Sequence, residues 1–231
     1  MPRRARVAPG GVVFHVLNRA NGRLRLFKKD ADYLAFERLL VEARERVPIR
    51  VLDWCLMPNH WHLVLWPRRD GELTDFLRWL TLTHAQRWKH AHGAVGHGHL
   101  YQGRFKSFPV DRDESLRTVL RYVQRNPLRA RLVARAERWR WGSCRVRLRG
   151  PAELAALLTE WPVDAPRDWL KWVNEPQTDE EVGLLRLSVN RGRPLGRPEW
   201  VARTAERLGL THTLRPPGRP LGWRKRKQES E

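Results

Sequence analysis

Hydrophobic side chains between residues 12 and 138 follow two spacings, and each spacing predicts a kind of element. Short runs of branched and aromatic side chains bounded by turn residues are typical of β-strands, and they occur at 12–18, 49–56 and 61–66. Hydrophobic positions every three or four residues, with charged positions between them, predict amphipathic helices at 30–47, 72–90 and 114–125. Residues 104–111 predict another strand, in which Pro109 favours an edge or a bulge.

The order of these elements predicts the fold class. It is strand, helix, strand, strand, helix, strand, with a closing helix that follows a capping Asp113, pauses at Pro127 and fades near Arg138. This is the α+β, ferredoxin-like βαββαβ order, in which helices cover one face of an antiparallel sheet. The opposite face of such a sheet is free to hold a site or a nucleic acid.

The pattern changes after Trp139, and we divide the chain near this point. Residues 139–144 predict a strap against the domain, and shorter helical patterns follow at 151–174, 180–189 and 198–208. The last two have the spacing of a small helix-turn-helix, although no recognition face can be assigned. We expect a domain over residues 1–148 and a helical, basic, DNA-binding extension over 149–231. The tail from about residue 212 is rich in Arg, Lys, Gly and Pro, which predicts disorder in the free protein.

Composition adds a polyanionic partner to this picture. The 45 Lys and Arg against 25 Asp and Glu give a net charge of +20 and a pI near 11.4, which points first to nucleic acid and second to an anionic membrane surface. No apolar run is long enough to span a bilayer, and the basic start has no apolar signal segment behind it, so membrane and secretion interpretations weaken. Cys55 and Cys144 are too few for a four-cysteine zinc site or a disulfide framework, which favours a reducing cytoplasm.

His60 and His62 are two positions apart on a predicted strand, so their side chains point to the same face with Cα atoms about 7 Å apart. Two imidazoles at that separation can converge on one divalent metal ion. Trp61 and Leu63 share the other face, which suits a core. The alternative is a pair of sheet histidines with ordinary hydrogen-bond partners, and that is how we interpret His15 on the first strand.

Tyr122 and Asn126 are four residues apart on the third predicted helix and therefore share one of its faces. A tyrosine hydroxyl is a weak nucleophile at neutral pH. Its attack on a phosphodiester requires help with deprotonation and stabilisation of charge on the non-bridging oxygens. A divalent ion held by His60 and His62 can polarise that phosphate and orient it for in-line attack. A packing tyrosine whose hydroxyl faces water is the alternative.

These residues belong to longer motifs that resemble a known family. Three motifs resemble, in order and spacing, the single-tyrosine HUH (IS200-like) transposases: Leu56-Met57-Pro58-Asn59-His60-Trp61-His62-Leu63, Gly103-Arg104-Phe105-Lys106-Ser107, and Tyr122 with Asn126-Pro127-Leu128-Arg129-Ala130. The REP-associated tyrosine transposases of bacteria are the most similar branch. The resemblance covers residues 8–145 and extends more loosely to Arg191-Gly192-Arg193-Pro194. The combination is specific, whereas no single motif is.

The resemblance implies strand-specific cleavage and rejoining of single-stranded DNA. The resemblance also implies that His60 and His62 bind Mg²⁺ or Mn²⁺, and that Tyr122 attacks the scissile phosphate to give a 5′-phosphotyrosine and a free 3′-OH. Rejoining reverses this step with another DNA end, so no external energy is required. The implied substrate is a REP-like sequence, a short guide beside an imperfect hairpin. Related transposases work as dimers, whereas the REP-associated branch implies a monomer in which Tyr122 reaches its own histidines.

Asn126 has two interpretations that stay open. In the family, a polar residue one helical turn after the tyrosine completes the metal shell, and here that position is Asn126. An Asn directly before a proline is also a good N-cap for a new helix. An imidazole pair suits Mn²⁺ somewhat better than Mg²⁺, which prefers oxygen ligands.

Basic and polar residues near these motifs are candidate DNA contacts. We predict that DNA is bound by Arg19, Asn21, Gln102, Arg104, Lys106, Arg129, Arg193 and Arg219. A solvated basic surface is the alternative, and the glycine-flanked pair His97 and His99 is interpreted as a DNA-contacting loop or plain surface. Three Gly-Arg-Pro triplets, at Gly192, Gly196 and Gly218, resemble AT-hook arms but suit a basic disordered tail equally well.

The sequence therefore predicts a metal-dependent enzyme that nicks and joins DNA in the cytoplasm, associated with the nucleoid and not with a membrane. Two alternatives remain. One is a non-catalytic DNA-binding regulator that keeps the fold, and the other is a hydrolytic metallonuclease that uses metal-bound water in place of Tyr122.

Overall fold

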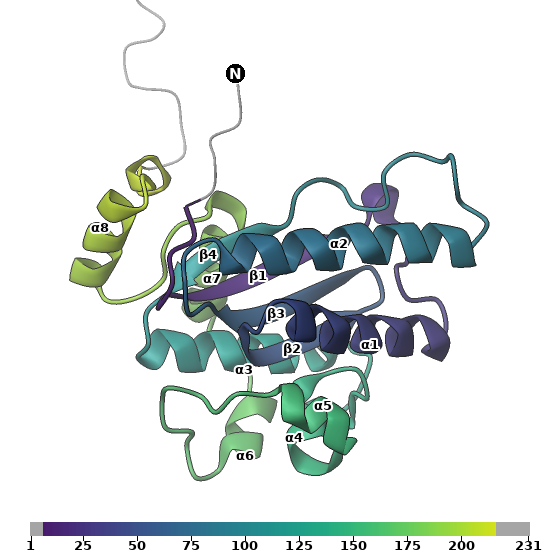
Figure 1. The fold of residues 1–231 in the computed structure, drawn as a ribbon. Coiled ribbons are helices and arrows are strands. Elements are labelled where there is room, and N and C mark those ends of the chain that lie inside the picture. Colours follow the sequence, from purple (N-terminus) through teal and green to yellow (C-terminus); the bar gives the residue numbers. More distant parts are fainter. Residues whose placement is uncertain (1–6, 216–231) are drawn as a thin grey trace, which may run out of the picture.

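A four-stranded antiparallel sheet forms the centre of the protein (Figure 1). The structure is a computed structural model that describes residues 7–215, so residues 1–6 and 216–231 lie outside the description. The strands are β1 (Val13–Arg19), β2 (Arg50–Met57), β3 (His60–Trp66) and β4 (Lys106–Val110). They lie in the order β2-β3-β1-β4, and each neighbouring pair is antiparallel. The sheet confirms the predicted ferredoxin-like order, and Pro109 lies on the edge strand β4, as predicted.

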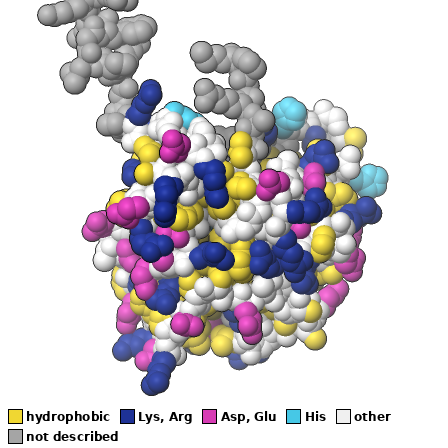
Figure 2. Space-filling model, turned by 60° about the vertical axis from the view of Figure 1, so that its left-hand side comes forward, with side chains coloured by type: hydrophobic (Ala, Val, Ile, Leu, Met, Phe, Trp, Pro, Cys, Tyr) yellow, Lys and Arg dark blue, Asp and Glu magenta, His cyan; other side chains and the backbone are white. Residues whose placement is uncertain are grey.

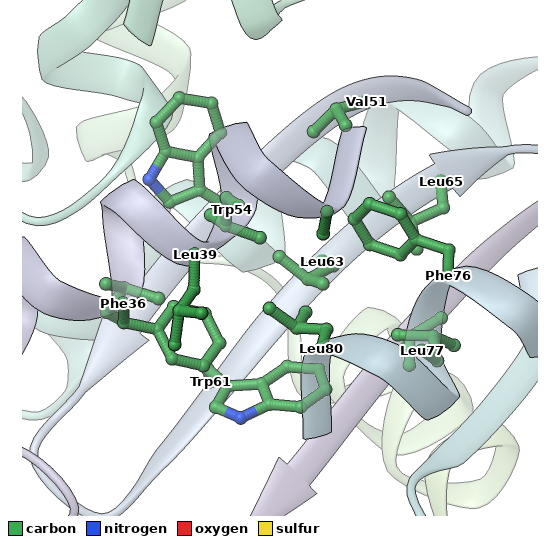
Figure 3. Close-up of a cluster of buried hydrophobic side chains, with 14 of the residues drawn as sticks. Phe36, Leu39, Val51, Trp54, Trp61, Leu63, Leu65, Phe76, Leu77 and Leu80 are labelled. Atoms are coloured by element: carbon green, nitrogen blue, oxygen red, sulfur yellow. The ribbon is translucent and has the colours of Figure 1, made fainter. Parts of the chain in front are cut away.

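The two crossover helices, α1 (Asp30–Arg46) and α2 (Glu72–Ala91), cover one face of the sheet. Alternation along β3 turns Trp61 and Leu63 toward these helices, where both are fully buried. Figure 3 shows them packed against side chains of both helices, and the Phe36 and Trp61 ring centroids are 5.7 Å apart. This apolar layer holds the histidine strand in place from behind.

The closing helix, α3 (Glu114–Arg129), packs on the opposite face of the sheet. The side chain of Asp113 accepts a hydrogen bond from the Ser115 backbone N–H at 2.8 Å, which confirms the predicted cap. Leu120 and Val123 of α3 are buried in the same cluster as Val64 and Phe108 of the sheet. The face that we expected to be free is therefore partly covered, because both the helix and the sheet have apolar side chains to bury there.

Helix α3 does not pause at Pro127, so that prediction was wrong. The helix continues to Arg129 and ends at Ala130. Pro127 cannot donate to the carbonyl of Val123, but it lies in the last turn, where one lost hydrogen bond does not end the helix early. The predicted helical continuation toward Arg138 is only a 3₁₀ turn, Ala136–Arg138.

Beyond α3 the chain returns to β2 and then forms short helices. The Leu56 backbone N–H donates to the Trp141 carbonyl at 2.9 Å and Cys55 forms a bridge with Gly142, which confirms the predicted strap. The remaining helices are α4 (Ser143–Arg149), α5 (Ala152–Leu157), α6 (Trp169–Asn174), α7 (Asp179–Arg191) and α8 (Pro198–Arg207). Within residues 7–215, none of the helices has the length and apolar character that crossing a membrane requires.

The chain between α7 and α8 lies along the edge strand β4. The Leu195 backbone N–H donates to the Pro109 carbonyl at 2.9 Å, and the Asp111 N–H donates to the Leu195 carbonyl at 2.8 Å. Pro194 is buried, and the Arg197 guanidinium is 3.1 Å from Asp111 Oδ2. The first two Gly-Arg-Pro triplets are therefore packed on the domain and do not form the free arm of an AT-hook. The same packed segment separates α7 from α8, so the two helices are not joined by the tight turn of a helix-turn-helix. The third triplet lies outside the described residues.

Candidate active site

His60 and His62 point from β3 toward α3, and their ring centroids are 5.0 Å apart. His60 Nδ1 is 2.6 Å from the Asn59 side-chain oxygen, to which it donates, so its Nε2 has a free lone pair. His62 Nδ1 is 2.9 Å from His15 Nε2, whereas His62 Nε2 is buried and has no hydrogen-bond partner among residues 7–215. Both histidines can therefore present Nε2 to one point between β3 and α3.

His15 is the neighbour that sequence reasoning placed on the sheet without a functional role. Its interpretation as a hydrogen-bonded sheet histidine is confirmed, but the partner is His62. His15 faces Val64 in the β1–β3 register, which makes His62 its diagonal neighbour. The sequence contains no direct signal for this pair, because it depends on the register of two strands that are far apart along the chain.

Burial keeps the three imidazoles neutral at physiological pH. It lowers the pKa of His60 from 6.5 to about 4, with smaller contributions from the positive charges of Arg19 and Arg129. It lowers the pKa of His15 to about 3 and that of His62 well below 6.5, where His60 and His15 add to the effect. Neutral imidazole is the form of histidine that binds metal ions.

Tyr122 lies on the face of α3 that is turned to the histidines. Its ring centroid is 5.9 Å from that of His62, and the two rings meet edge to face. The hydroxyl accepts a hydrogen bond from Arg129 Nη2 at 3.1 Å, and the same guanidinium stands 4.5 Å from the Tyr122 ring centroid. One chain therefore supplies the tyrosine and both histidines.

Asn126 lies within α3, so the interpretation as an N-cap was wrong. Its Nδ2 donates to the Tyr122 carbonyl at 3.0 Å, and its Oδ1 accepts from Arg129 Nη2 at 2.7 Å. The side chain is buried one turn beyond Tyr122. Asn126 therefore ties Arg129 to the tyrosine turn, and ligation of a metal ion by Oδ1 stays a prediction.

A cavity of about 310 Å³ opens beside these side chains. It is lined by His60, His62, Tyr122 and Asn126 together with four predicted DNA contacts, Arg19, Gln102, Lys106 and Arg129. Among the described residues, the side chains of Arg19, Gln102 and Lys106 make no hydrogen bond or ion pair. The cavity therefore has unengaged basic and polar groups around a buried tyrosine.

The other predicted DNA contacts lie farther from Tyr122. Arg104 lines an adjoining cavity of about 360 Å³, which it shares with Lys106. Asn21 is exposed in the turn after β1, Arg193 is half-buried beside β4, and neither lines either cavity. Arg219 lies outside the described residues. His97 and His99 are exposed in the loop after α2.

Two residues of the cavity wall come from α7 and were missed by sequence reasoning. Val189 and Asn190 line both cavities. We predicted the helix to end at residue 189 without any relation to the site. The signal is absent from the sequence, because the position of α7 depends on its packing against β4 and α3.

The available metal donors are few and neutral. In the part of the chain that the structure describes, no three His, Cys, Asp or Glu side chains cluster closely enough to hold a metal ion. The donor set at the site therefore consists of two imidazoles and the amide oxygen of Asn126. Such a set suits Mn²⁺ better than Mg²⁺.

Net charge alone does not mark the site, because basic residues are spread over the surface. Figure 2 shows Lys and Arg side chains across the face at the left of Figure 1, with acidic side chains among them. Several arginines near the site are engaged with protein groups. Arg125 Nη1, for example, donates to the Val173 carbonyl at 3.0 Å. The arginines and lysines without such partners are the better candidates for binding phosphate.

Comparison with known families decides the assignment. The family described as IS200-like transposases matches residues 11–126, half of the chain, from two residues before β1 to Asn126. The chain belongs to the IS200-like transposase family. A comparison with curated proteins finds no significant match for this chain.

Solved structures that are similar to this chain include two described as transposases. One is a REP-associated tyrosine transposase bound to a REP hairpin, which is 21% identical with a TM-score of 0.52 and covers 65% of this chain and 87% of that chain. The other, from Deinococcus radiodurans R1, is described as a candidate transposase. It is 16% identical with a TM-score of 0.38, and the match covers 57% of this chain and 92% of that chain. The first likeness confirms the fold.

Proposed function

We propose that this protein nicks and rejoins single-stranded DNA at REP-like hairpins through a 5′-phosphotyrosine on Tyr122. The observation that carries the proposal is the position of Tyr122, with its ring 5.9 Å from His62 in a cavity with unengaged basic groups. The family supports DNA strand transfer, and the similar solved structure is of a protein bound to a REP hairpin.

In the proposed step, the Tyr122 hydroxyl oxygen forms a bond to phosphorus, and the bond from phosphorus to the 3′ oxygen breaks. The tyrosine loses its proton and the leaving 3′ oxygen takes one up, so protons and phosphate bonds balance. Arg129 holds the hydroxyl through its 3.1 Å hydrogen bond and places a positive charge beside the reacting phosphate. Attack by the 3′-OH of another end reverses the step and joins the two strands.

His60 and His62 would hold a divalent ion, Mn²⁺ or Mg²⁺, through their Nε2 atoms. The residues fit this role, because both imidazoles are neutral and the buried His62 Nε2 has no partner in the described part of the chain. Asn126 Oδ1 would be the third donor, once it has given up its hydrogen bond from Arg129 Nη2 and bound the ion instead. When bound, the ion supplies positive charge that polarises the scissile phosphate.

The remaining assignments follow from this site. Residues 1–148 hold the catalytic centre, and residues 149–231 form a DNA-binding extension. Arg19, Gln102, Arg104 and Lys106 contact the strand near the scissile phosphate, and Asn21, Arg193 and Arg219 contact more distant DNA. Because Tyr122 and the histidines come from one chain, a monomer suffices. The activity would take place in the cytoplasm, on the nucleoid.

The experiment that tests the proposal incubates the protein with labelled single-stranded hairpin DNA and Mn²⁺, then detects a covalent adduct on a denaturing gel. We expect an adduct that requires the metal and disappears in Tyr122→Phe. Tyr33→Phe is the matched control, because Tyr33 stacks on Trp141 on the other side of the sheet. An adduct that survives Tyr122→Phe contradicts the assignment of the nucleophile. Cleavage without an adduct favours the hydrolytic metallonuclease, and binding without cleavage favours the regulator.

A further inference from the structure

Helix α7 belongs to the C-terminal extension, yet its first half is fixed on the catalytic helix α3. Arg121 of α3 is buried and donates to the carbonyls of Glu175 and Pro176 at 2.9 and 3.0 Å, directly before α7 begins. Thr178 and Glu181 form a capping box at the start of α7. Leu185, in the middle of the helix, is 1% exposed within the cluster that α3 shares with the sheet.

The second half of α7 is fixed on β4. The helix ends at Gly192, whose φ of +71° is the left-handed conformation that glycine adopts readily. The chain then pairs with β4 through Leu195. Arg197 forms ion pairs with Asp111 at 3.1 Å and Asp113 at 3.3 Å. The last turn of α7 therefore has a defined position relative to both Tyr122 and β4.

This last turn forms a wall of the active-site cavity. Val189 and Asn190 line the cavity of His60, His62 and Tyr122, and they also line the adjoining cavity that contains Arg104. Lys106 is shared by the two cavities as well. The two cavities therefore meet at the end of α7, and a strand that leaves Tyr122 toward Arg104 passes Asn190.

The chemistry of the two sides of this path differs. Arg104 and Lys106 are exposed cations without partners among the described residues, which suits phosphate. The opposite side is the C-terminal end of α7, whose partial negative charge disfavours phosphate. Arg191 also lines the adjoining cavity there, but its guanidinium is engaged by the His212 carbonyl at 3.4 Å. Asn190 at that end is exposed, and its side chain makes no hydrogen bond within the described part of the chain. Its side-chain amide offers an N–H donor beside a carbonyl acceptor. This pattern can form two hydrogen bonds with the edge of a base, and adenine is the base that it matches best.

We propose that Asn190 determines specificity by reading the base of a nucleotide next to the one held at Tyr122. The C-terminal extension would then supply part of the substrate site itself. The inference deepens the proposed function and rests on it only in requiring that single-stranded DNA lies at Tyr122.

The test is a selection for binding that does not depend on cleavage. A pool of single-stranded DNA, with a hairpin flanked by randomised bases, is selected on the full-length Tyr122→Phe protein with and without Asn190→Ala. We expect Asn190→Ala to reduce the preference for one base about tenfold at a single position of the DNA, and to leave the base preferences at the other positions unchanged. Gln86→Ala is the matched control, since it also removes an exposed helix amide but lies on α2, on the other side of the sheet. Both side chains are exposed, so both variants should keep the melting temperature of the parent.

Three results would overturn the inference: unchanged preferences in Asn190→Ala, a uniform weakening for all sequences, or a parent without any base preference. Failure of the proposed function looks different. In that case the protein with Tyr122 intact forms no covalent adduct, while the selection result still stands, because it measures binding alone.

Discussion

His15 Nε2 lies 2.9 Å from His62 Nδ1. Only a donor at His62 Nδ1 leaves the buried Nε2 of His62 with a lone pair for a metal ion. Metal binding at His62 Nε2 therefore requires that His62 Nδ1 donates to His15 Nε2, and in that arrangement β1 orients the ring of a proposed ligand on β3.

Removing this acceptor should weaken metal binding. We expect His15→Leu to lower Mn²⁺ affinity by about 10- to 100-fold, as substitutions of residues that orient metal ligands do. His15→Gln should retain much of the affinity, because its amide oxygen can accept from His62 Nδ1. Electron paramagnetic resonance of free Mn²⁺ during a titration measures both, with the exposed His97→Ala as control. Wild-type affinity in His15→Leu would contradict the orienting role.

Lys106 should contribute to phosphate binding, because its side chain lines both cavities and is unpaired within the described residues. The slope of log K against log salt for single-stranded DNA should fall by about 0.7 in Lys106→Ala. Arg197→Ala should leave the slope unchanged, since its charge is already paired with Asp111 and Asp113. Equal slopes in Lys106→Ala and wild type would remove Lys106 from the interface.

Asp53 should make the protein less stable as pH rises. This carboxyl is fully buried on β2, where it accepts from Gln124 Nε2 at 2.6 Å and from the Ser143 hydroxyl. Burial raises its pKa from 3.8 to about 7. The folded state therefore keeps a proton that the unfolded state loses. The stabilisation that this proton gives to the folded state is complete below pH about 4 and is lost as the pH rises to about 7.

Asp53→Asn tests this directly, because the amide mimics the protonated carboxyl in shape and charge. The variant should unfold at higher urea concentration than wild type at pH 8 and at a similar concentration at pH 4. The gain at pH 8 should not exceed about 4 kcal/mol, at about 1.4 kcal/mol for each unit of pKa. A variant that is less stable than wild type at pH 8 would show that Asp53 is needed as the anion. Glu37, whose burial also raises its pKa to about 7, keeps some pH dependence in both proteins.

Tyr101 should stabilise the histidine strand from the other side of the sheet. Its buried hydroxyl accepts from Trp61 Nε1 at 3.0 Å and is 2.6 Å from His84 Nδ1. Tyr101→Phe leaves the Trp61 N–H without a partner, which should cost about 1–3 kcal/mol of the free energy of unfolding. Chemical denaturation measures the loss, and adduct formation at saturating Mn²⁺ should persist. A loss of adduct in a folded Tyr101→Phe protein would place Tyr101 in the chemistry instead.

The local patterns of the sequence predicted the parts of the fold that depend on neighbouring residues. The alternation around Trp61 predicted the two faces of β3 correctly. The family motifs predicted that Tyr122 and the two histidines lie together, and all three line one cavity. Asn126 was ambiguous because Asn-Pro is a helix-start signal, and only the surrounding packing shows that α3 continues through it. The His15–His62 contact and the position of Asn190 depend on strand register and on packing between distant segments. Neither can be read from spacing along the chain.

Covalent attachment of Tyr122 to DNA distinguishes the proposed chemistry from hydrolysis and from binding alone. The chain has three tyrosines, so the attachment point can be identified by digesting the adduct with protease and nuclease and locating the nucleotide remnant by mass spectrometry. We expect a phosphonucleotide on Tyr122 alone. A remnant on Tyr33 or Tyr101, or cleaved DNA with all three tyrosines unmodified, would contradict it.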